Sequence, residues 1–192
     1  MSTKKELRKI VFARRKEATD AEIAEKSRRL FERVTAMPEY AAAKRVFCYA
    51  DYNHEVMTGG FMEQCWRDGK EVAVPRVNGD VMNFYSITSS DQLSPGCKGI
   101  PEPLDAPEKG YNSAEHLADD WEDAFFIIPG VAFDAERRRC GYGGGFYDKY
   151  QEAHRNHVTV AVAFDFQVLD EVPADEYDIK PQYLVTESKV YK

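Results

Sequence analysis

The glycine run at residues 141–145 constrains this chain more than any other stretch of its sequence. It reads Gly-Tyr-Gly-Gly-Gly and is followed by Phe146-Tyr147-Asp148-Lys149. Such a run is not suited to core packing, because glycine has no side chain to bury and loses the most backbone entropy on folding. It offers instead backbone N–H groups that can turn inward around an anion without a Cβ in the way.

The segments on either side of the run predict its structural setting. Residues 124–129 read Ala-Phe-Phe-Ile-Ile-Pro, which is typical of a buried strand, and three arginines at 137–139 lead into the loop. Residues 146–154 have a composition that suits a helix. The order strand, glycine loop, helix N-terminus favours a phosphate cradle, although a flexible turn between strand and helix is the alternative. The run has neither the Walker pattern nor the dinucleotide fingerprint, but its Arg-rich entry and acidic exit favour a nucleotide with a metal ion.

Two cations near the start of the chain share one helix face. Residues 4–17 repeat apolar side chains at helical spacing, and Lys4 and Arg8 lie four positions apart on that predicted helix. A solvated charged face is the alternative interpretation. A second helix is expected from residue 19 or 20 to about Met37, where Pro38 would end it.

Several short apolar segments predict the strands of a mostly parallel sheet in a single domain over residues 1–192. Helical segments alternate with them, which is typical of an α/β sandwich. The acidic stretch 102–123 is expected to be a solvated loop, because it lies in a region broken by prolines and glycines. Besides 124–129, the predicted strands are 45–50, 71–75, 81–87, 158–164 and 183–186.

Composition narrows the function classes. The net charge is −7, with a basic N-terminal segment and an acidic remainder, which disfavours general nucleic-acid binding. No apolar run is long enough for a membrane span and the N-terminus is charged, so a cytoplasmic protein without membrane partners is expected. The cysteines form no Cys-x-x-Cys pair, which indicates reduced structural thiols and disfavours zinc; they are Cys48, Cys65, Cys97 and Cys140.

The histidines give no metal signal. His54 has no partner at metal-ligand spacing, and we interpret it as incidental. His154 and His157 lie three apart, and a polar pair at a helix end is favoured over metal ligation because no third ligand is evident.

The segment IIPGVAFDAERRRCGYGGGFYDKY resembles the signature of the 5-formyltetrahydrofolate cyclo-ligase family, also called 5,10-methenyltetrahydrofolate synthetase. That signature has a Pro-Gly strand exit, Phe-Asp, a basic-Leu-Gly segment and a glycine run closed by Tyr-Tyr-Asp-Arg. This chain departs from it mildly at Cys140, Phe146 and Lys149. The Lys-x-x-x-Arg pattern at Lys4 and Arg8 and the segment GIPEPL extend the resemblance along most of the chain.

The resemblance implies a three-layer α/β/α sandwich and an enzyme that uses Mg²⁺ and ATP to cyclise 5-formyltetrahydrofolate to 5,10-methenyltetrahydrofolate, as a monomer. It implies folate contacts at Ala50 and at Glu55, which stands in a Glu-x-x-Thr context, and Mg²⁺ ligands at Asp148 and Asp178. The family usually has His-Asp where this chain has Tyr177-Asp178, followed by a second Asp where Gln182 stands, which leaves the contribution of that following position open. The implied ATP-binding residues are Lys4, Arg8, Arg139, Cys140, Gly141, Tyr142, Gly143, Gly144, Gly145, Phe146 and Tyr147.

The implied chemistry needs no protein nucleophile. An N-formyl oxygen is a poor leaving group, so ATP phosphorylates it, N10 of the folate attacks the activated carbon, and phosphate departs. The protein's contribution is then mainly positioning and charge neutralisation. Two other classes stay open: a sugar-phosphate or CoA enzyme on a similar sandwich, and a non-enzymatic nucleotide-binding regulator whose basic N-terminal arm contacts nucleic acid. ATP consumption that depends on 5-formyltetrahydrofolate would discriminate among the three.

Overall fold

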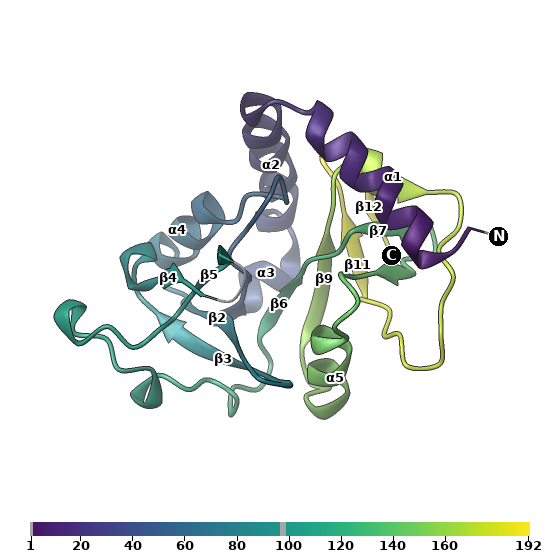
Figure 1. Cartoon of the computed structure of the whole chain (residues 1–192). Coiled ribbons are helices and arrows are strands. Elements are labelled where there is room, and N and C mark those ends of the chain that lie inside the picture. Colours follow the sequence, from purple (N-terminus) through teal and green to yellow (C-terminus); the bar gives the residue numbers. More distant parts are fainter. Residues whose placement is uncertain (1, 97–98) are drawn as a thin grey trace.

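A seven-stranded sheet forms the centre of the computed structural model, which describes residues 2–96 and 99–192 (Figure 1). The strand order is β12-β11-β9-β6-β1-β2-β3. The neighbours from β11 to β2 pair in parallel, and the edge strands β12 and β3 are antiparallel, so the predicted mostly parallel sheet is confirmed. The strands are β1 (Arg45–Phe47), β2 (Glu71–Asn78), β3 (Val81–Ile87), β6 (Phe125–Ile128), β9 (Val158–Val162), β11 (Tyr183–Val185) and β12 (Val190–Tyr191).

Helices cover both faces of the sheet, as expected for three layers. Side chains alternate between faces along a strand: Phe125 and Ile127 contact one hydrophobic cluster, whereas Phe126 and Ile128 contact the other. The first cluster packs under α2 (Asp20–Thr35), α3 (Pro38–Ala42) and α4 (Gly59–Arg67). The second packs under α5 (Phe146–Ala153) and part of the acidic stretch.

Five strand predictions were inaccurate at their ends: β6 by one residue at each end, β11 by one residue, β9 by two, and β1 and β2 by three. β1 ends at Phe47, whereas a strand to Ala50 was predicted; the N–H of Cys48 still donates to the carbonyl of Ala73 at 2.9 Å, and the strand itself does not continue beyond Phe47. β2 continues to Asn78 because its last residues pair with the start of β3 across a hairpin. The short edge strand β12 was not predicted at all.

The prediction for Pro38 was also inaccurate. α2 ends at Thr35 as expected within two residues, but Pro38 begins the new helix α3. Proline suits the first position of a helix, where its missing N–H would have no intrahelical partner.

The prediction that residues 102–123 form a solvated loop was wrong. Tyr111, Ala118 and Trp121 are buried, and the N–H of Ala118 donates to the carbonyl of Phe84 at 2.8 Å. Apolar side chains spaced among the acids therefore cover β3. The short elements of the region are the ribbon strands β4 (Ser94–Pro95) and β5 (Pro101–Glu102) and the 3₁₀ turns η1 (Ser90–Gln92), η3 (Pro107–Lys109) and η4 (Ser113–Glu115).

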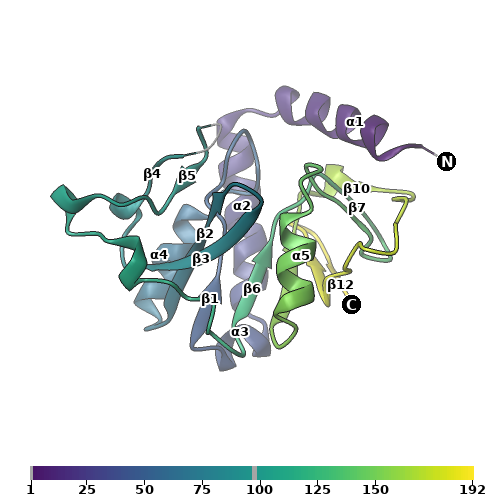
Figure 2. The same ribbon diagram turned by 60° about the horizontal axis from the view of Figure 1, so that its bottom comes forward.

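The N-terminal helix packs on a second, three-stranded sheet rather than on the main one. α1 (Lys4–Glu17) has the predicted bounds, and a capping box between Thr3 and Glu6 begins it. Leu7 and Val11 are buried against the small sheet, and Figure 2 shows α1 over β7 and β10. That sheet contains β7 (Ala132–Asp134), β8 (Arg139–Cys140) and β10 (Val168–Leu169), with the turn η5 (Asp165–Gln167) beside it.

Three cysteines are buried and free, namely Cys48, Cys65 and Cys140, in agreement with the predicted structural thiols. The fourth, Cys97, lies outside the described residues. Within the described chain, no helix combines the length and the apolar character that a membrane crossing requires.

Candidate active site

A cavity of about 520 Å³ opens where β1 and β6 end. The residues that follow these neighbouring parallel strands, Ala50 and Pro129, both line it, as is usual for ligand sites in open α/β sheets. α1 and the glycine loop also contribute to its wall. All of the site residues predicted from the sequence line this cavity except Cys140; they are Lys4, Arg8, Ala50, Glu55, Arg139, 141–148 and Asp178.

Cys140 lies beside the cavity without lining it. Its side chain is buried in the cluster that also contains Leu7 and Val11, and its Sγ lies 3.6 Å from the carbonyl oxygen of Lys4. Burial raises the pKa of this thiol. The structure therefore places Cys140 behind the glycine loop, in the contact between α1 and β8.

The glycine loop has a backbone that only glycine adopts at low cost. Gly143 has φ of 105°, and Gly145 has φ of 67° immediately before α5. A Cβ on Gly144 would lie 2.8 Å from the ring of Phe146. The loop delivers the chain to the N-terminus of α5, whose first N–H groups have no partner within the helix.

α1 meets the glycine loop at the cavity, so the two ends of the predicted nucleotide site come together in space. The Nε of Arg8 donates to the carbonyl of Gly141 at 2.7 Å. The Nζ of Lys4 donates to Asp175 at 2.7 Å and to Asp178 at 2.5 Å. Burial opposes the charge of Lys4, but these two carboxylates outweigh it and raise the pKa of the amine.

Both carboxylates predicted to bind a metal are paired with cations of the same cavity. Asp178 pairs with Lys4, and Asp148 pairs with Arg139 at 2.7 Å. The second oxygen of Asp148 accepts from the N–H of Ile179 at 3.1 Å. Within the described ranges, no group of three or more His, Cys, Asp or Glu side chains is arranged to hold a metal ion.

Gln182, whose contribution to metal binding the resemblance left open, lies apart from Asp148 and Asp178. Gln182 pairs with Thr159, its N–H donating to Oγ1 at 2.9 Å, and it does not line the cavity. Tyr177 is 76% exposed and does not line it either.

Glu55 is buried at the cavity wall and is held through both carboxylate oxygens. Its Oε2 accepts from the N–H of Tyr52 at 3.0 Å, and its Oε1 accepts from the hydroxyl of Tyr142 at 2.6 Å. Burial raises the pKa of Glu55, which the hydrogen bond from Tyr142 and the charge of Arg15 oppose.

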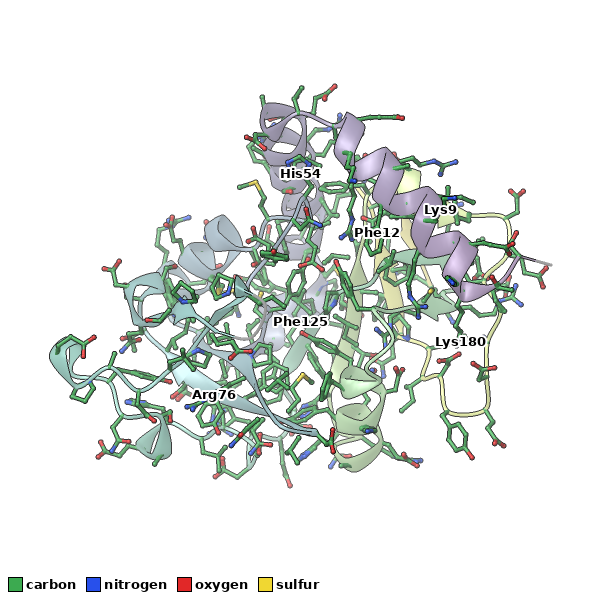
Figure 3. The ribbon with its side chains drawn as sticks, in the orientation of Figure 1. Lys9, Phe12, His54, Arg76, Phe125 and Lys180 are labelled. Carbon is green, nitrogen blue, oxygen red and sulfur yellow. The ribbon has the colours of Figure 1, made fainter. Side chains whose placement is uncertain are left out.

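His54, interpreted from the sequence as incidental, holds the turn that carries Glu55. Asn53 and His54 both have left-handed φ, at 50° and 56°. Figure 3 shows His54 near the junction of α1 and α2, where its ring nitrogens lie 2.7 Å from the carbonyl of Arg15 and 2.9 Å from Asp20. These two acceptors raise the pKa of His54.

Sequence reasoning missed part of the cavity wall and the residue behind Glu55. Arg15 is only 3% exposed, and its spacing of four from Val11 is the signal that would have placed it on the buried helix face. The missed lining residues come from loops and hairpins that no local pattern brings together; they are Tyr49, Pro75, Val77, Ile100, Pro101, Glu102, Pro129 and Asp175.

Comparison with known proteins gives a consistent match along the chain. Residues 1–187 match the model of the 5-formyltetrahydrofolate cyclo-ligase family. The chain is 30% identical over 208 residues to a probable 5-formyltetrahydrofolate cyclo-ligase of Schizosaccharomyces pombe, covering 100% of this chain and 99% of that one. It is 30% identical over 190 residues to the 5-formyltetrahydrofolate cyclo-ligase of Escherichia coli K12, covering 95% and 100%.

Solved structures similar to this one include two 5,10-methenyltetrahydrofolate synthetases. The NMR structure of Aquifex aeolicus 5,10-methenyltetrahydrofolate synthetase superimposes with a TM-score of 0.82 at 31% identity, covering 98% of this chain and 92% of that one. A 5,10-methenyltetrahydrofolate synthetase from Mycoplasma pneumoniae gives 0.71 at 20% identity, covering 97% and 99%, and so supports the fold alone.

Proposed function

This chain belongs to the 5-formyltetrahydrofolate cyclo-ligase family and is an ATP-dependent ligase that converts 5-formyltetrahydrofolate to 5,10-methenyltetrahydrofolate, and we propose that the cavity between α1 and the glycine loop is its active site. One observation carries the assignment of the site. The cations of α1, the glycine loop and the buried carboxylate of Glu55 all line this single cavity, although they lie far apart in the sequence.

The reaction needs two substrates held against each other. The formyl oxygen attacks the γ-phosphorus of ATP, the bond from that phosphorus to the β-phosphate oxygen breaks, and ADP leaves. N10 then attacks the activated formyl carbon, loses its proton, and the carbon–oxygen bond breaks with its electron pair leaving on phosphate. We assign the protein the tasks of aligning oxygen with phosphorus and of stabilising the charge on the transferred group.

The cations of the cavity are in position to receive phosphate oxygens. Lys4 and Arg139 are each paired with a carboxylate, and Arg8 is held against the glycine loop. Phosphate oxygens are stronger partners for a guanidinium or an ammonium than a backbone carbonyl is, because both groups are charged. We therefore assign Lys4, Arg8 and Arg139 to the phosphates of ATP, together with the loop from Gly141 to Tyr147.

The charge balance of the cavity supports a divalent cation. Among the described lining residues, carboxylates outnumber cations, with Glu55, Glu102, Asp148, Asp175 and Asp178 against Lys4, Arg8 and Arg139. A triphosphate entering this set would add repulsion unless positive charge came with it. Mg²⁺ prefers one or two carboxylates together with phosphate oxygens, and Asp148 and Asp178 fit that role. When bound, Mg²⁺ would neutralise the charge developing on the transferred phosphoryl group.

We assign the folate to the part of the cavity that contains Ala50 and Glu55. A carboxylate is only an acceptor, so Glu55 suits N–H groups of the folate. The apolar lining from the β2–β3 hairpin, which includes Val77 and Met82, offers a surface for the folate rings. A cytoplasmic location and a monomeric state stay predictions from the sequence.

The experiment that tests this function uses purified protein with Mg²⁺, ATP and 5-formyltetrahydrofolate. We expect the near-ultraviolet absorbance of the methenyl product to appear, with ADP and phosphate formed in equal amounts. ATP consumption without folate would instead favour the sugar-phosphate or CoA class, and ATP binding without consumption would favour the non-enzymatic regulator. Folded protein that forms no methenyl product would contradict the proposal.

A further inference from the structure

A chain of three side chains joins the core beneath α1 to the cavity wall. The Nη1 of Arg15 donates to the hydroxyl oxygen of Tyr142 at 2.5 Å, and that hydroxyl donates to Oε1 of Glu55 at 2.6 Å. Arg15 comes from α1, Tyr142 from the glycine loop and Glu55 from the turn after β1, so three distant segments meet at one hydroxyl group.

Arg15 is anchored more deeply than a surface arginine would be. It is 3% exposed, its Nη2 donates to the carbonyl of Gly130 at 3.0 Å, and its guanidinium lies 5.9 Å from the ring centroids of both Phe12 and Tyr142. Figure 3 shows Phe12 on the inner side of α1. The Nε of Arg15 has no hydrogen-bond partner among the described residues. A cation is costly to bury, so its main compensation here comes from Tyr142 and, beyond it, from Glu55.

Glu55 depends on the hydrogen bonds from Arg15 through Tyr142 to remain ionised. Burial raises the pKa of Glu55, and the groups that favour its ionised form are the hydroxyl of Tyr142, the charge of Arg15 and the N–H of Tyr52. Asp51 acts in the opposite direction, and the other titratable neighbours, Tyr49 and Tyr147, are buried phenols whose own pKa values are raised by burial. Without Tyr142, one carboxylate oxygen of Glu55 would lose its donor, and Arg15 would lose one of its two acceptors and keep only the carbonyl of Gly130.

The same hydroxyl connects Glu55 to the loop assigned to the nucleotide. Tyr142 stands between Gly141, whose carbonyl accepts from Arg8, and Gly143, whose φ is 105°. The ring of Tyr142 is about half exposed at the cavity, whereas its hydroxyl group is held between Arg15 and Glu55. The hydroxyl of Tyr142 thereby attaches the glycine loop to the folate side of the cavity.

We propose that Tyr142 and Arg15 are positioning residues that hold Glu55 ionised and correctly oriented for the folate, and that they do so from the glycine loop. This inference rests on the proposed function, in which Glu55 contacts the folate. It adds that the loop next to the phosphates helps to set the affinity for the other substrate. Neither residue needs to touch the reacting atoms.

The test is a double-substitution cycle of Tyr142→Phe and Glu55→Gln, read by calorimetric titration of 5-formyltetrahydrofolate without ATP. We expect Tyr142→Phe to weaken folate binding about tenfold and ATP binding much less, because the ring is kept and one charge-assisted hydrogen bond is lost. In the Glu55→Gln background, Tyr142→Phe should have little further effect, because the group that it positions has already lost its charge. Arg15→Lys should weaken folate binding in the same direction.

The dependence of folate affinity on pH distinguishes positioning from simple packing. Removing the hydroxyl of Tyr142 removes a group that lowers the pKa of Glu55, so that pKa should rise. Folate affinity should therefore begin to fall at a higher pH in Tyr142→Phe than in the unaltered protein as the solution is made more acidic.

Tyr183→Phe is the matched control, because it removes a tyrosine–carboxylate hydrogen bond of 2.5 Å, to Glu39, from outside the cavity. The Tyr183→Phe variant should leave unchanged both the folate affinity and the pH at which that affinity falls on acidification, which we call its acid limb. A folded Tyr142→Phe variant with unaltered folate affinity and acid limb, or one that loses ATP and folate affinity equally with no shift of the limb, would overturn the proposal. Methenyl formation by the unaltered protein is measured alongside, so a failure of the proposed function is seen separately.

Discussion

At the scale of single residues, the cavity is organised by ion pairs that a ligand has to rearrange. Lys4 bridges Asp175 and Asp178, and Arg139 holds Asp148, so these charges assigned to ATP and Mg²⁺ already have partners of opposite sign. The pair of Arg139 with Asp148 keeps a buried charge compensated in the protein without ligand, because an unpaired charge at that depth would cost several kcal/mol. A phosphate group offers the cations an alternative partner of the same sign as the carboxylates.

Lys4→Met tests the assignment of this cation. We expect KM for ATP to rise by about one to two powers of ten, because a charge-assisted hydrogen bond is lost, while KM for the folate changes much less. Lys5→Met is the control, since Lys5 is an exposed neighbour on the same helix. Steady-state kinetics with each substrate varied in turn provide the measurement, and equal values for the two variants would show that the Lys4 face is only a charged surface.

Point substitution is a better test of α1 than removal of its first turns. The sequence suggests that little apolar surface would be lost with residues 1–8, but Leu7 is 4% exposed and packs on the small sheet. Burying a leucine contributes about 1.5–3 kcal/mol, so a truncation would lower stability as well as remove the cations.

At the scale of elements, the glycine loop combines a tight backbone path with close neighbours. Arg8 holds its first carbonyl, Tyr142 ties its middle to Glu55, and Gly145 ends it at the start of α5. The loop is therefore defined by contacts to α1 and to the turn after β1, rather than by the main sheet alone. A change in its backbone should affect nucleotide binding before it affects the core.

Gly143→Ala tests that expectation. At φ of 105° an alanine is strained by roughly 1–3 kcal/mol, so the loop should shift and KM for ATP should rise about tenfold or more. Gly60→Ala in α4 is the control: a Cβ there meets no atom within 4 Å, and the helix should gain roughly 0.5–1 kcal/mol of stability. Steady-state kinetics give KM for ATP, and urea unfolding gives the free energy of unfolding, for both variants. An unchanged KM for ATP in Gly143→Ala would contradict the role given to the loop.

At the scale of the whole molecule, two histidines have opposite effects on how stability depends on pH. His157 is 5% exposed between β6 and β9, and its Nδ1 accepts from the N–H of Ala124 at 3.2 Å, so the folded state holds the ring neutral. Burial, with a smaller effect from His154, lowers the pKa of His157 to about 4. The hydrogen bonds to Arg15 and Asp20 instead raise the pKa of His54.

The signs of these two effects on stability follow from the linkage between proton binding and folding. The unfolded chain protonates His157 near its ordinary pKa of 6.5, so stability is lost as pH falls from that value towards about 4, with a limit of roughly 3 kcal/mol. His54 contributes stability below its ordinary pKa and loses it as pH rises through the raised value. Because its side chain is partly exposed, that contribution is below about 1 kcal/mol.

His157→Gln therefore should flatten the acid side of the stability curve. Glutamine retains a hydrogen-bond acceptor but does not titrate, so the free energy of unfolding should fall less between pH 7 and about pH 4.5 than in the unaltered protein. Urea unfolding at several pH values gives the comparison, with His54→Gln as the variant of opposite sign. Equal slopes for His157→Gln and the unaltered protein would show that His157 titrates normally in the fold.

Local patterns in the sequence were sufficient for most of the main helices and strands, whereas most of the site residues were expected from the resemblance to a known family. The helix Lys4–Glu17 and the strand Val81–Ile87 have the predicted bounds, because period and capping are properties of neighbouring residues. The glycine run, with its flanking strand and helix, likewise indicated a ligand loop from a few adjacent positions. Every predicted site residue but Cys140 lines the cavity, although only those after β1 and β6 are brought there by the shared edge of the parallel strands.

Only the tertiary structure decided which of these groups meet. The pairing of Lys4 with Asp178, the position of Gln182 beside Thr159 and the burial of Tyr111 in an acidic stretch depend on contacts between segments far apart in the chain. So does the chain of hydrogen bonds from Arg15 through Tyr142 to Glu55. A local pattern specifies which face of an element is apolar, but the partner of a buried polar group is determined by how the layers pack, because that packing sets which donors and acceptors lose water together.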